Sequence, residues 1–271
     1  MAPIQRFPSG FPHGMKGSLR LVTIPISHYC ERARWALDYC GHIYDEEQHL
    51  QIFHRRVVRR LGGKQTVPIL VTDAETLYDS REIVQFAHHN RQNQQGLYPD
   101  AAPLRSQVEQ FEDTIEGEFG AEVRRIGYAH FLSHVALVRK YNGAAAPWWQ
   151  RHSLSLVFPF VLPAIKRYFN VTPETVAQAE KIVSRHLDQI AERLADGRQF
   201  LFGDRFTAAD LAFSSLLAPL LLVPQYGIAL PRLEELPTEM RTLVEHYRGH
   251  PAGQFAIRMY RDHRRKGASE I

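Results

Sequence analysis

The sequence predicts two domains, an α/β domain at residues 18–92 followed by an all-helical domain at residues 103–262. Two observations support this fold class. A short apolar run at residues 19–24 ends at a proline, and the apolar residues that follow it recur at helical spacing. After a polar, turn-rich linker at residues 92–103, apolar residues keep helical spacing and strand signals do not repeat.

The first domain is predicted to open with a strand, a helix and a second strand within about 30 residues, which is typical of a βαβ unit. Gly41 is well placed to end the helix. A pair of strands and a further helix follow. The predicted elements are a strand at 19–24, a helix from Ser27 to Cys40, a weaker strand at 43–50, strands at 66–71 and 76–78, and a helix after Asp79-Ser80.

Several helix starts are visible in the second domain. Thr172 precedes a proline and a glutamate, which is typical of the first turn of a helix, and Thr207 opens another helix. The two most apolar stretches, 154–165 and 211–223, contain prolines and are too short to span a bilayer. Both are interpreted as buried helical segments.

Composition excludes several classes of protein. The 271 residues are 44% hydrophobic, which is enough to bury a sizeable core. The net charge of +4 comes without a dense basic run, which argues against a nucleic-acid partner. The basic residues near the C-terminus are interpreted as a solvated tail: Arg261, Arg264, Arg265 and Lys266. Two cysteines, Cys30 and Cys40, rule out a disulfide scaffold and favour a reducing, cytoplasmic location.

Targeting and metal signals are missing from the sequence as well. The first 17 residues contain three prolines and no apolar core, so they are not interpreted as a signal peptide. No membrane partner is therefore expected. The 14 histidines are scattered, and no cluster has metal-ligand spacing, so no metal is expected.

The first candidate for chemistry is the strand-to-helix junction at Ser27–Arg32. A helix N-terminus favours negative charge, and Ser27 could donate a hydrogen bond to a thiolate held there. Cys30 would lie in or near the first turn, where its own pKa could be lowered. The alternative is that Ser27 is only a helix cap and Cys30 a small core residue. Taken alone, the junction favours this alternative.

Two further motifs could bind a ligand. If the Val67–Pro68 bond is cis, Val67 turns its backbone N–H and C=O outward to pair with an extended peptide, although general frequencies favour trans. Ser80 and the free N–H groups of the following helix could bind a carboxylate, and Asp79 could attract an amine. The alternative for both residues is ordinary helix capping.

In this order and spacing, the three motifs resemble the thioredoxin-like domain of cytosolic glutathione transferases. The resemblance continues in the second domain, where Phe200–Leu211 is similar to the segment that leads into the buried capping-box helix of the family. Thr207 and Asp210 fit that box. The matched residues of the first domain are Ser27-His28-Tyr29-Cys30 with Arg32 and Ala36-Leu37, Val67-Pro68-Ile69-Leu70, and Asp79-Ser80 with Ile83.

The resemblance implies that glutathione, as co-substrate, lies across the first domain. The main chain of Val67 would pair with the cysteinyl part of glutathione beside a cis Pro68, and Ser80 would hold the γ-glutamyl carboxylate. Asp79 stands where glutamate or glutamine is usual. The glutathione-binding residues implied in this way are Lys64, Thr66, Val67, Pro68, Asp79 and Ser80.

Ser27 matches the catalytic serine of the serine-type classes. It would stabilise the glutathione thiolate, which attacks an electrophilic carbon of an apolar second substrate. The motif also resembles the Cys-x-x-Cys of glutaredoxins with its first cysteine replaced, so Cys30 stays a candidate auxiliary thiol. His28 could be a nearby base or a solvated side chain, and the second interpretation is favoured. Two alternatives to a transferase remain, a thiol oxidoreductase that uses glutathione and Cys30, and a non-catalytic protein that binds apolar ligands.

The second substrate is expected between the domains, an apolar electrophilic small molecule. Four aromatic residues at helical spacing are candidates for lining its site, although such residues are more often part of a core: Phe111, Phe119, Tyr128 and Phe131. The aromatic region at 148–160 is extra relative to compact family members and could widen the site, cover it or extend a dimer contact. The resemblance also implies a homodimer.

Overall fold

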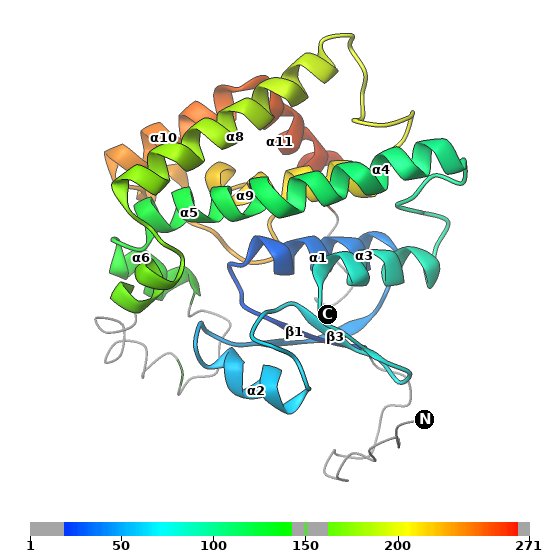
Figure 1. The fold of residues 1–271 in the computed structure, drawn as a ribbon, viewed down its shortest axis with the longest axis horizontal. Coiled ribbons are helices and arrows are strands. Elements are labelled where there is room, and N and C mark those ends of the chain that lie inside the picture. The colour runs from blue at the N-terminus through cyan, green and yellow to red at the C-terminus, as the bar shows by residue number, and fades with distance from the viewer. Residues whose placement is uncertain (1–18, 143–149, 151–161, 265–271) are drawn as a thin grey trace.

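The computed structural model in Figure 1 describes residues 19–142, 150 and 162–264. A four-stranded sheet with three helices is followed by helices only. The elements of the first domain are β1 (Leu19–Thr23), α1 (His28–Tyr39), β2 (Tyr44–Gln48), α2 (His54–Arg60), β3 (Ile69–Val71), β4 (Thr76–Leu77) and α3 (Ser80–His89). Those of the second are α4 (Ala102–Thr114), η1 (Ile115–Phe119), α5 (Gly120–Phe131), α6 (Val135–Asn142), α8 (Pro173–Leu194), α9 (Ala208–Leu221), η2 (Leu233–Glu235), α10 (Thr238–Gly249) and α11 (Pro251–His263).

The sheet has the strand order β2-β1-β3-β4. β1 and β2 are parallel, because α1 connects them, whereas β3 pairs antiparallel with both β1 and β4. The predicted strand at 66–71 is shorter in the structure. It begins at Ile69, directly after Pro68, which has no N–H to donate to a ladder.

Neighbouring residues of β1 and β3 serve two separate cores. Leu21 lies opposite Leu70, and both belong to the large core shared with the helical domain. Val22 lies opposite Ile69, and both pack with Val58 of α2. Side chains alternate between the faces of a strand, so this register places α2 on one face and α1 with α3 on the other. Figure 1 shows α1 and α3 between the sheet and the helical domain.

The second domain is helical, as predicted: from residue 102 onward the described residues contain no strand. The helix α9 is buried over almost its whole length, in agreement with the interpretation of 211–223. Asp210 fixes its start, because one carboxylate oxygen accepts from the N–H of Thr207 at 2.8 Å and the other from the N–H of Leu201 at 2.7 Å. The apolar stretch at 154–165 lies largely outside the described residues, which resume with a helical segment at 162–168.

The end of the chain is tied to the first domain. Trp35 Nε1 donates to the carbonyl of His263 at 3.2 Å. The buried Arg264 bonds Glu31 Oε1 at 2.8 Å and Asp38 Oδ2 at 2.6 Å, both on α1. The interpretation of Arg264 as part of a solvated tail is therefore wrong, because α11 ends against α1 and brings the guanidinium to two carboxylates.

No helix in the described part of the chain has the length and apolar character needed to cross a membrane.

Candidate active site

A cavity of about 590 Å³ lies between the two domains. Its first wall comes from the β1–α1 junction, the chain on either side of α2, and the start of α3. Its second wall comes from η1, α5, α6, the segment at 164–169 and the chain after α9. The cavity thus brings together motifs that are more than 50 residues apart in the sequence, from Ser27 to Ser80.

Ser27 lies at the N-cap of α1 and lines the cavity. Its Oγ accepts from the N–H of Cys30 at 3.4 Å, so the oxygen has a lone pair committed to the helix. The Ser27 side chain also hydrogen-bonds the thiol of Cys30, which lowers the pKa of that thiol in part. A hydroxyl carries one donor and two acceptor sites, so Ser27 can cap the helix and still donate to a ligand.

Cys30 faces away from this cavity. Its side chain is fully buried, and the N–H of Ile24 approaches its sulfur at 3.4 Å. Burial raises the pKa of the thiol to about 11, although Arg34 and the hydrogen bond from Ser27 lower it in part. Because the thiolate is the reactive form of cysteine, such a thiol is a poor nucleophile at neutral pH.

His28 and Tyr29, the next two residues of α1, reach across to the second domain. The interpretation of His28 as solvated is wrong, because it is only 3% exposed and its Nε2 donates to the carbonyl of Gly120 at 3.1 Å. Burial, with the charge of Arg124, lowers the pKa of His28 to about 3, so its ring is neutral. A Cβ at Gly120 would lie 2.6 Å from the Tyr29 hydroxyl, so glycine permits this approach.

The segment before β3 lines the cavity through Thr66, Val67 and Pro68. The Val67–Pro68 bond is cis, as the resemblance implies. Lys64 is exposed and does not line the cavity. His54, which lines it from α2, is 3.1 Å from the carbonyl of Gln65 through Nε2, while its buried Nδ1 has no hydrogen-bond partner among the described residues.

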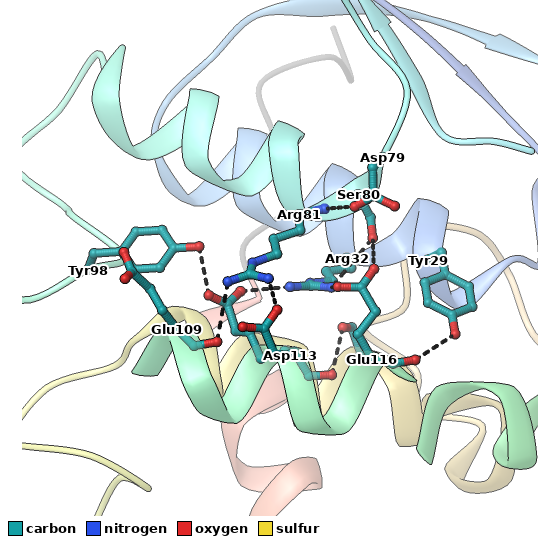
Figure 2. Close-up of polar contacts among 12 residues, drawn as sticks. Tyr29, Arg32, Asp79, Ser80, Arg81, Tyr98, Glu109, Asp113 and Glu116 are labelled. Atoms are coloured by element: carbon teal, nitrogen blue, oxygen red, sulfur yellow. Dashed lines mark hydrogen bonds and ion pairs between the residues drawn. The ribbon is translucent and has the colours of Figure 1, made fainter. Parts of the chain in front are cut away.

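Asp79 and Ser80 stand together at the start of α3 and both line the cavity. Asp79 is the N-cap, and its Oδ1 accepts from the N–H of Arg81 at 2.8 Å. Ser80 is almost fully buried, and its Oγ lies 3.5 Å from a carboxylate oxygen of Glu116. Figure 2 shows the Ser80 and Glu116 side chains pointing toward one another from the two domains.

Glu116 comes from η1, a single π-helical turn between α4 and α5. Arg32 of α1 forms an ion pair with this glutamate and with a second one. Its Nη1 lies 2.9 Å from Glu116 Oε2, and its Nη2 lies 2.7 Å from Glu112 Oε1. Arg32 and Glu112 are both fully buried. Burial lowers the pKa of the Arg32 guanidinium and the two glutamates raise it by more, so Arg32 stays charged.

A second, more exposed ion pair connects the start of α3 to the second domain. Arg81 pairs with Asp113 of α4 and donates from Nη2 to the carbonyl of Glu109 at 3.3 Å. Both contacts are drawn in Figure 2. Glu116 carries no signal in the sequence, because a lone glutamate on an amphipathic helix is ordinarily solvated and no residue pattern marks a π-turn. The start of α3 is thus fixed to the second domain by two arginines.

The second wall is mainly apolar. Of the four aromatic candidates, Tyr128 and Phe131 line the cavity. The prediction is wrong for the other two, since Phe111 packs on Phe202 at 5.5 Å between ring centroids and Phe119 on Phe213 at 5.6 Å. All four residues have helical spacing, but only Tyr128 and Phe131, near the C-terminal end of α5, line the cavity. The other aliphatic and phenyl side chains of this wall include those of Leu132, Leu137, Val138, Ile165, Phe169, Leu222 and Leu230.

The arrangement can hold an extended, charged molecule against the first wall and an apolar one against the second. A hydroxyl donor, Ser27, lies at the end of a helix whose dipole favours an anion. Within the described residues, no three histidine, cysteine, aspartate or glutamate side chains gather as a metal ion would require.

Two family models match the chain. Residues 21–95 match the N-terminal domain of glutathione S-transferases, and residues 173–248 match the C-terminal domain of the same family. No curated protein sequence matches the chain.

Solved structures of the family share the fold at low identity. A theta class glutathione S-transferase from the citrus canker pathogen Xanthomonas axonopodis pv. citri, with glutathione bound, is 18% identical, with a TM-score of 0.55 over 89% of this chain and 98% of that one. A glutathione S-transferase from Rhodospirillum rubrum is 17% identical, with a TM-score of 0.56 over 90% and 98%. A beta-etherase from Sphingobium sp. strain SYK-6 is 14% identical, with a TM-score of 0.56 over 89% and 99%.

Proposed function

Because the chain belongs to the glutathione S-transferase family, we propose that it conjugates the thiolate of glutathione to apolar electrophiles. The observation that supports this activity best is the contrast between Ser27 and Cys30 at the first turn of α1. Ser27 lines the cavity with its hydroxyl, whereas the sulfur of Cys30 is fully buried. The chemistry therefore rests on a hydroxyl donor, with glutathione supplying the nucleophile.

Glutathione would lie along the first wall. Ser80 and the N–H groups at the start of α3 would hold its γ-glutamyl carboxylate. Asp79 and Glu116, the two carboxylates that line this end of the cavity, would face the γ-glutamyl ammonium. The main chain of Val67 would pair with the cysteinyl part. Thr66 and Arg55 of α2 also line the cavity and would serve the glycyl carboxylate.

The thiol would then reach the N-cap of α1. A hydrogen bond from Ser27 favours the charged form of the sulfur and lowers its pKa, and the helix end adds to this effect. The proton leaves to solvent, and the thiolate sulfur forms a bond to an electrophilic carbon. The leaving group departs with its electron pair, so no oxidant or reductant is needed. The cavity adds proximity, since it holds both reactants in one site.

Two other functions compete with this proposal. A thiol oxidoreductase that uses Cys30 requires the sulfur to meet a disulfide, and both its burial and its pKa of about 11 oppose that role. A non-catalytic protein that binds apolar ligands fits the second wall equally well, but it would not need a hydroxyl at Ser27 that lines the cavity.

The test is the rate of conjugation of 1-chloro-2,4-dinitrobenzene as a function of pH. Ser27→Ala should raise the apparent pKa of the bound glutathione thiol and reduce kcat/KM at neutral pH by roughly tenfold for each pKa unit lost. Glutathione affinity should remain nearly intact. Ser27→Thr keeps a hydroxyl and a cap, so it should retain most of the activity.

Cys30→Ser is the matched control, since it changes the only other candidate for thiol chemistry in the same helical turn. It should leave the pH profile of conjugation unchanged. Loss of turnover in Cys30→Ser with full activity in Ser27→Ala would place the protein among thiol reductases. Glutathione binding without any conjugation in the parent chain would favour the ligand-binding alternative.

A further inference from the structure

A positively charged side chain, that of Arg124, lies in the apolar part of the cavity. Arg124 is on α5, half-buried, and lines the cavity together with Tyr128 and Phe131, which follow four and seven residues later on the same helix face. The surrounding wall offers ring and aliphatic carbon atoms. An arginine in this position is unusual for a site that takes only apolar molecules.

The guanidinium of Arg124 has aromatic neighbours and no anionic partner. Its Cζ lies 4.5 Å from the ring centroid of Phe169 and 5.8 Å from that of Tyr29. It forms no hydrogen bond or ion pair with any residue in the described ranges. The segments outside those ranges contain a single acidic residue, Glu270, in the last two positions of the chain.

The buried arginines of the described chain behave differently. Arg32, Arg34 and Arg264 each pair with at least one carboxylate within 3 Å. A partly desolvated cation gains from aromatic faces, but it gains more from a carboxylate that its planar fork can bind through two hydrogen bonds. Arg124 lines the cavity with that interaction unused among the described residues.

The other charges of the cavity already have assigned partners. Glu116 is held by Arg32 at 2.9 Å, and Asp79 caps α3. Under the proposed binding of glutathione, its two carboxylates go to Ser80 and to the end near Arg55. Arg124 is eight residues beyond Glu116, about 12 Å along the helix axis, on the side of the second substrate.

We propose that Arg124 binds an anionic group on the second substrate, so that the preferred electrophiles are aromatic molecules that carry a carboxylate. This inference rests on the proposed function. The carboxylate would pair with the guanidinium between Tyr29 and Phe169, and the ring would lie against Tyr128 and Phe131. The electrophilic carbon would then be held at a fixed distance from the anchored group, which improves its orientation toward the thiolate.

The test compares 4-chloro-3,5-dinitrobenzoate with its methyl ester, two electrophiles that share a ring and a leaving group and differ in charge. Each kcat/KM is divided by the rate of the uncatalysed reaction with glutathione. The parent chain should prefer the acid. Arg124→Met should reduce that preference roughly tenfold to a hundredfold, with most of the change in the KM of the acid, and Arg124→Lys should keep part of it.

Arg167→Met is the control, because Arg167 is exposed on the neighbouring segment at 162–168 and its loss removes the same charge without touching the cavity. It should leave the preference unchanged. If Arg124→Met slows the acid and the ester equally and raises the pKa of the bound glutathione thiol, Arg124 acts on the thiolate and the proposal is overturned.

Failure of the proposed function can be told apart. If the parent chain conjugates neither electrophile, calorimetry with the unreactive 3,5-dinitrobenzoate still tests Arg124. Binding that is lost in Arg124→Met and retained in Arg167→Met supports an anion site, and equal binding in all three chains overturns it.

Discussion

The two walls of the cavity differ in how the sequence builds them. The polar wall uses three short motifs of the α/β domain, and each places its residues by a local rule: a helix cap at Ser27, a proline before a strand at Val67, and a second cap at Asp79. The apolar wall is collected from helices and loops between residues 116 and 231. No local rule selects which of its many apolar side chains face the cavity and which face the core.

The polar wall depends on the second domain for its rigidity. Ser80 touches Glu116 and Arg32, and Arg32 is held by Glu112 inside the joint between the domains. In the described part of the apolar wall the lining side chains are mainly aliphatic and aromatic, and the Tyr141 hydroxyl donates to Glu235. We therefore expect substitutions behind the polar wall to be costly for stability, and substitutions on the apolar wall to change substrate preference at a small cost.

The largest effect is expected from Glu112→Leu. This change leaves the fully buried Arg32 without one of its two carboxylates and should lower the free energy of unfolding by about 3–5 kcal/mol. The double variant Arg32→Met, Glu112→Leu removes both charges and should lose less than the sum of the single changes. Denaturant unfolding measures both, and a loss below about 1 kcal/mol in Glu112→Leu would contradict a stabilising role for the pair.

His28 should make stability depend on pH. Its pKa is about 3 in the folded protein and near 6.5 when unfolded, so between these values only the unfolded chain binds the proton. The free energy of unfolding is therefore at its full value above pH 6.5, where His28 is neutral in both states, and it decreases as the pH falls. Relative to His28→Gln, the parent chain should lose about 2–3 kcal/mol between pH 6.5 and pH 4. Parallel pH dependences of unfolding for the two chains would refute the burial of a neutral ring.

Ser80→Ala tests the polar wall as a carboxylate site. If a charge-assisted hydrogen bond to glutathione is lost, affinity should weaken by about 1.5–3 kcal/mol. Titration calorimetry with glutathione measures this affinity directly. Because Ser80 is nearly fully buried, a thermal melt of the variant should also be recorded to check that it is folded. An unchanged dissociation constant would remove Ser80 from the site.

The smallest effect is expected on the apolar wall. Phe131→Leu should raise the KM of a neutral aromatic electrophile by about two- to tenfold, because an aromatic contact contributes about 0.5–1.5 kcal/mol, and should leave glutathione affinity unchanged. Phe111→Leu is the matched control, since Phe111 has the same helical spacing but packs on Phe202. Equal changes in KM for the two variants would contradict the placement of Phe131 in the cavity and of Phe111 in the core.

The residues that could be predicted are those fixed by neighbours in the chain. Ser27, Val67 and Ser80 belong to motifs in which a cap or a proline constrains the backbone within two or three residues, and the resemblance to glutathione transferases implied their place in the site. Glu116 and Arg124 could not be predicted, since a charged residue on an amphipathic helix is ordinarily solvated. Contacts with α1, from η1 for Glu116 and from α5 for Arg124, turn these side chains inward. Arg264 was assigned to a solvated tail for the same reason.

By itself, the sequence determined the order of strands and helices, the division into an α/β and a helical domain, and the capped start of α9 with its buried Asp210. These follow from hydrophobic period and from hydrogen bonds that close within a few residues. Only the tertiary structure decided that Cys30 is buried beside an accessible Ser27, that His28 is neutral inside the joint, and that Arg124 faces the cavity without a carboxylate. The reason is that burial and charge pairing depend on segments about 45 to 95 residues apart in the chain, whose approach no local pattern records.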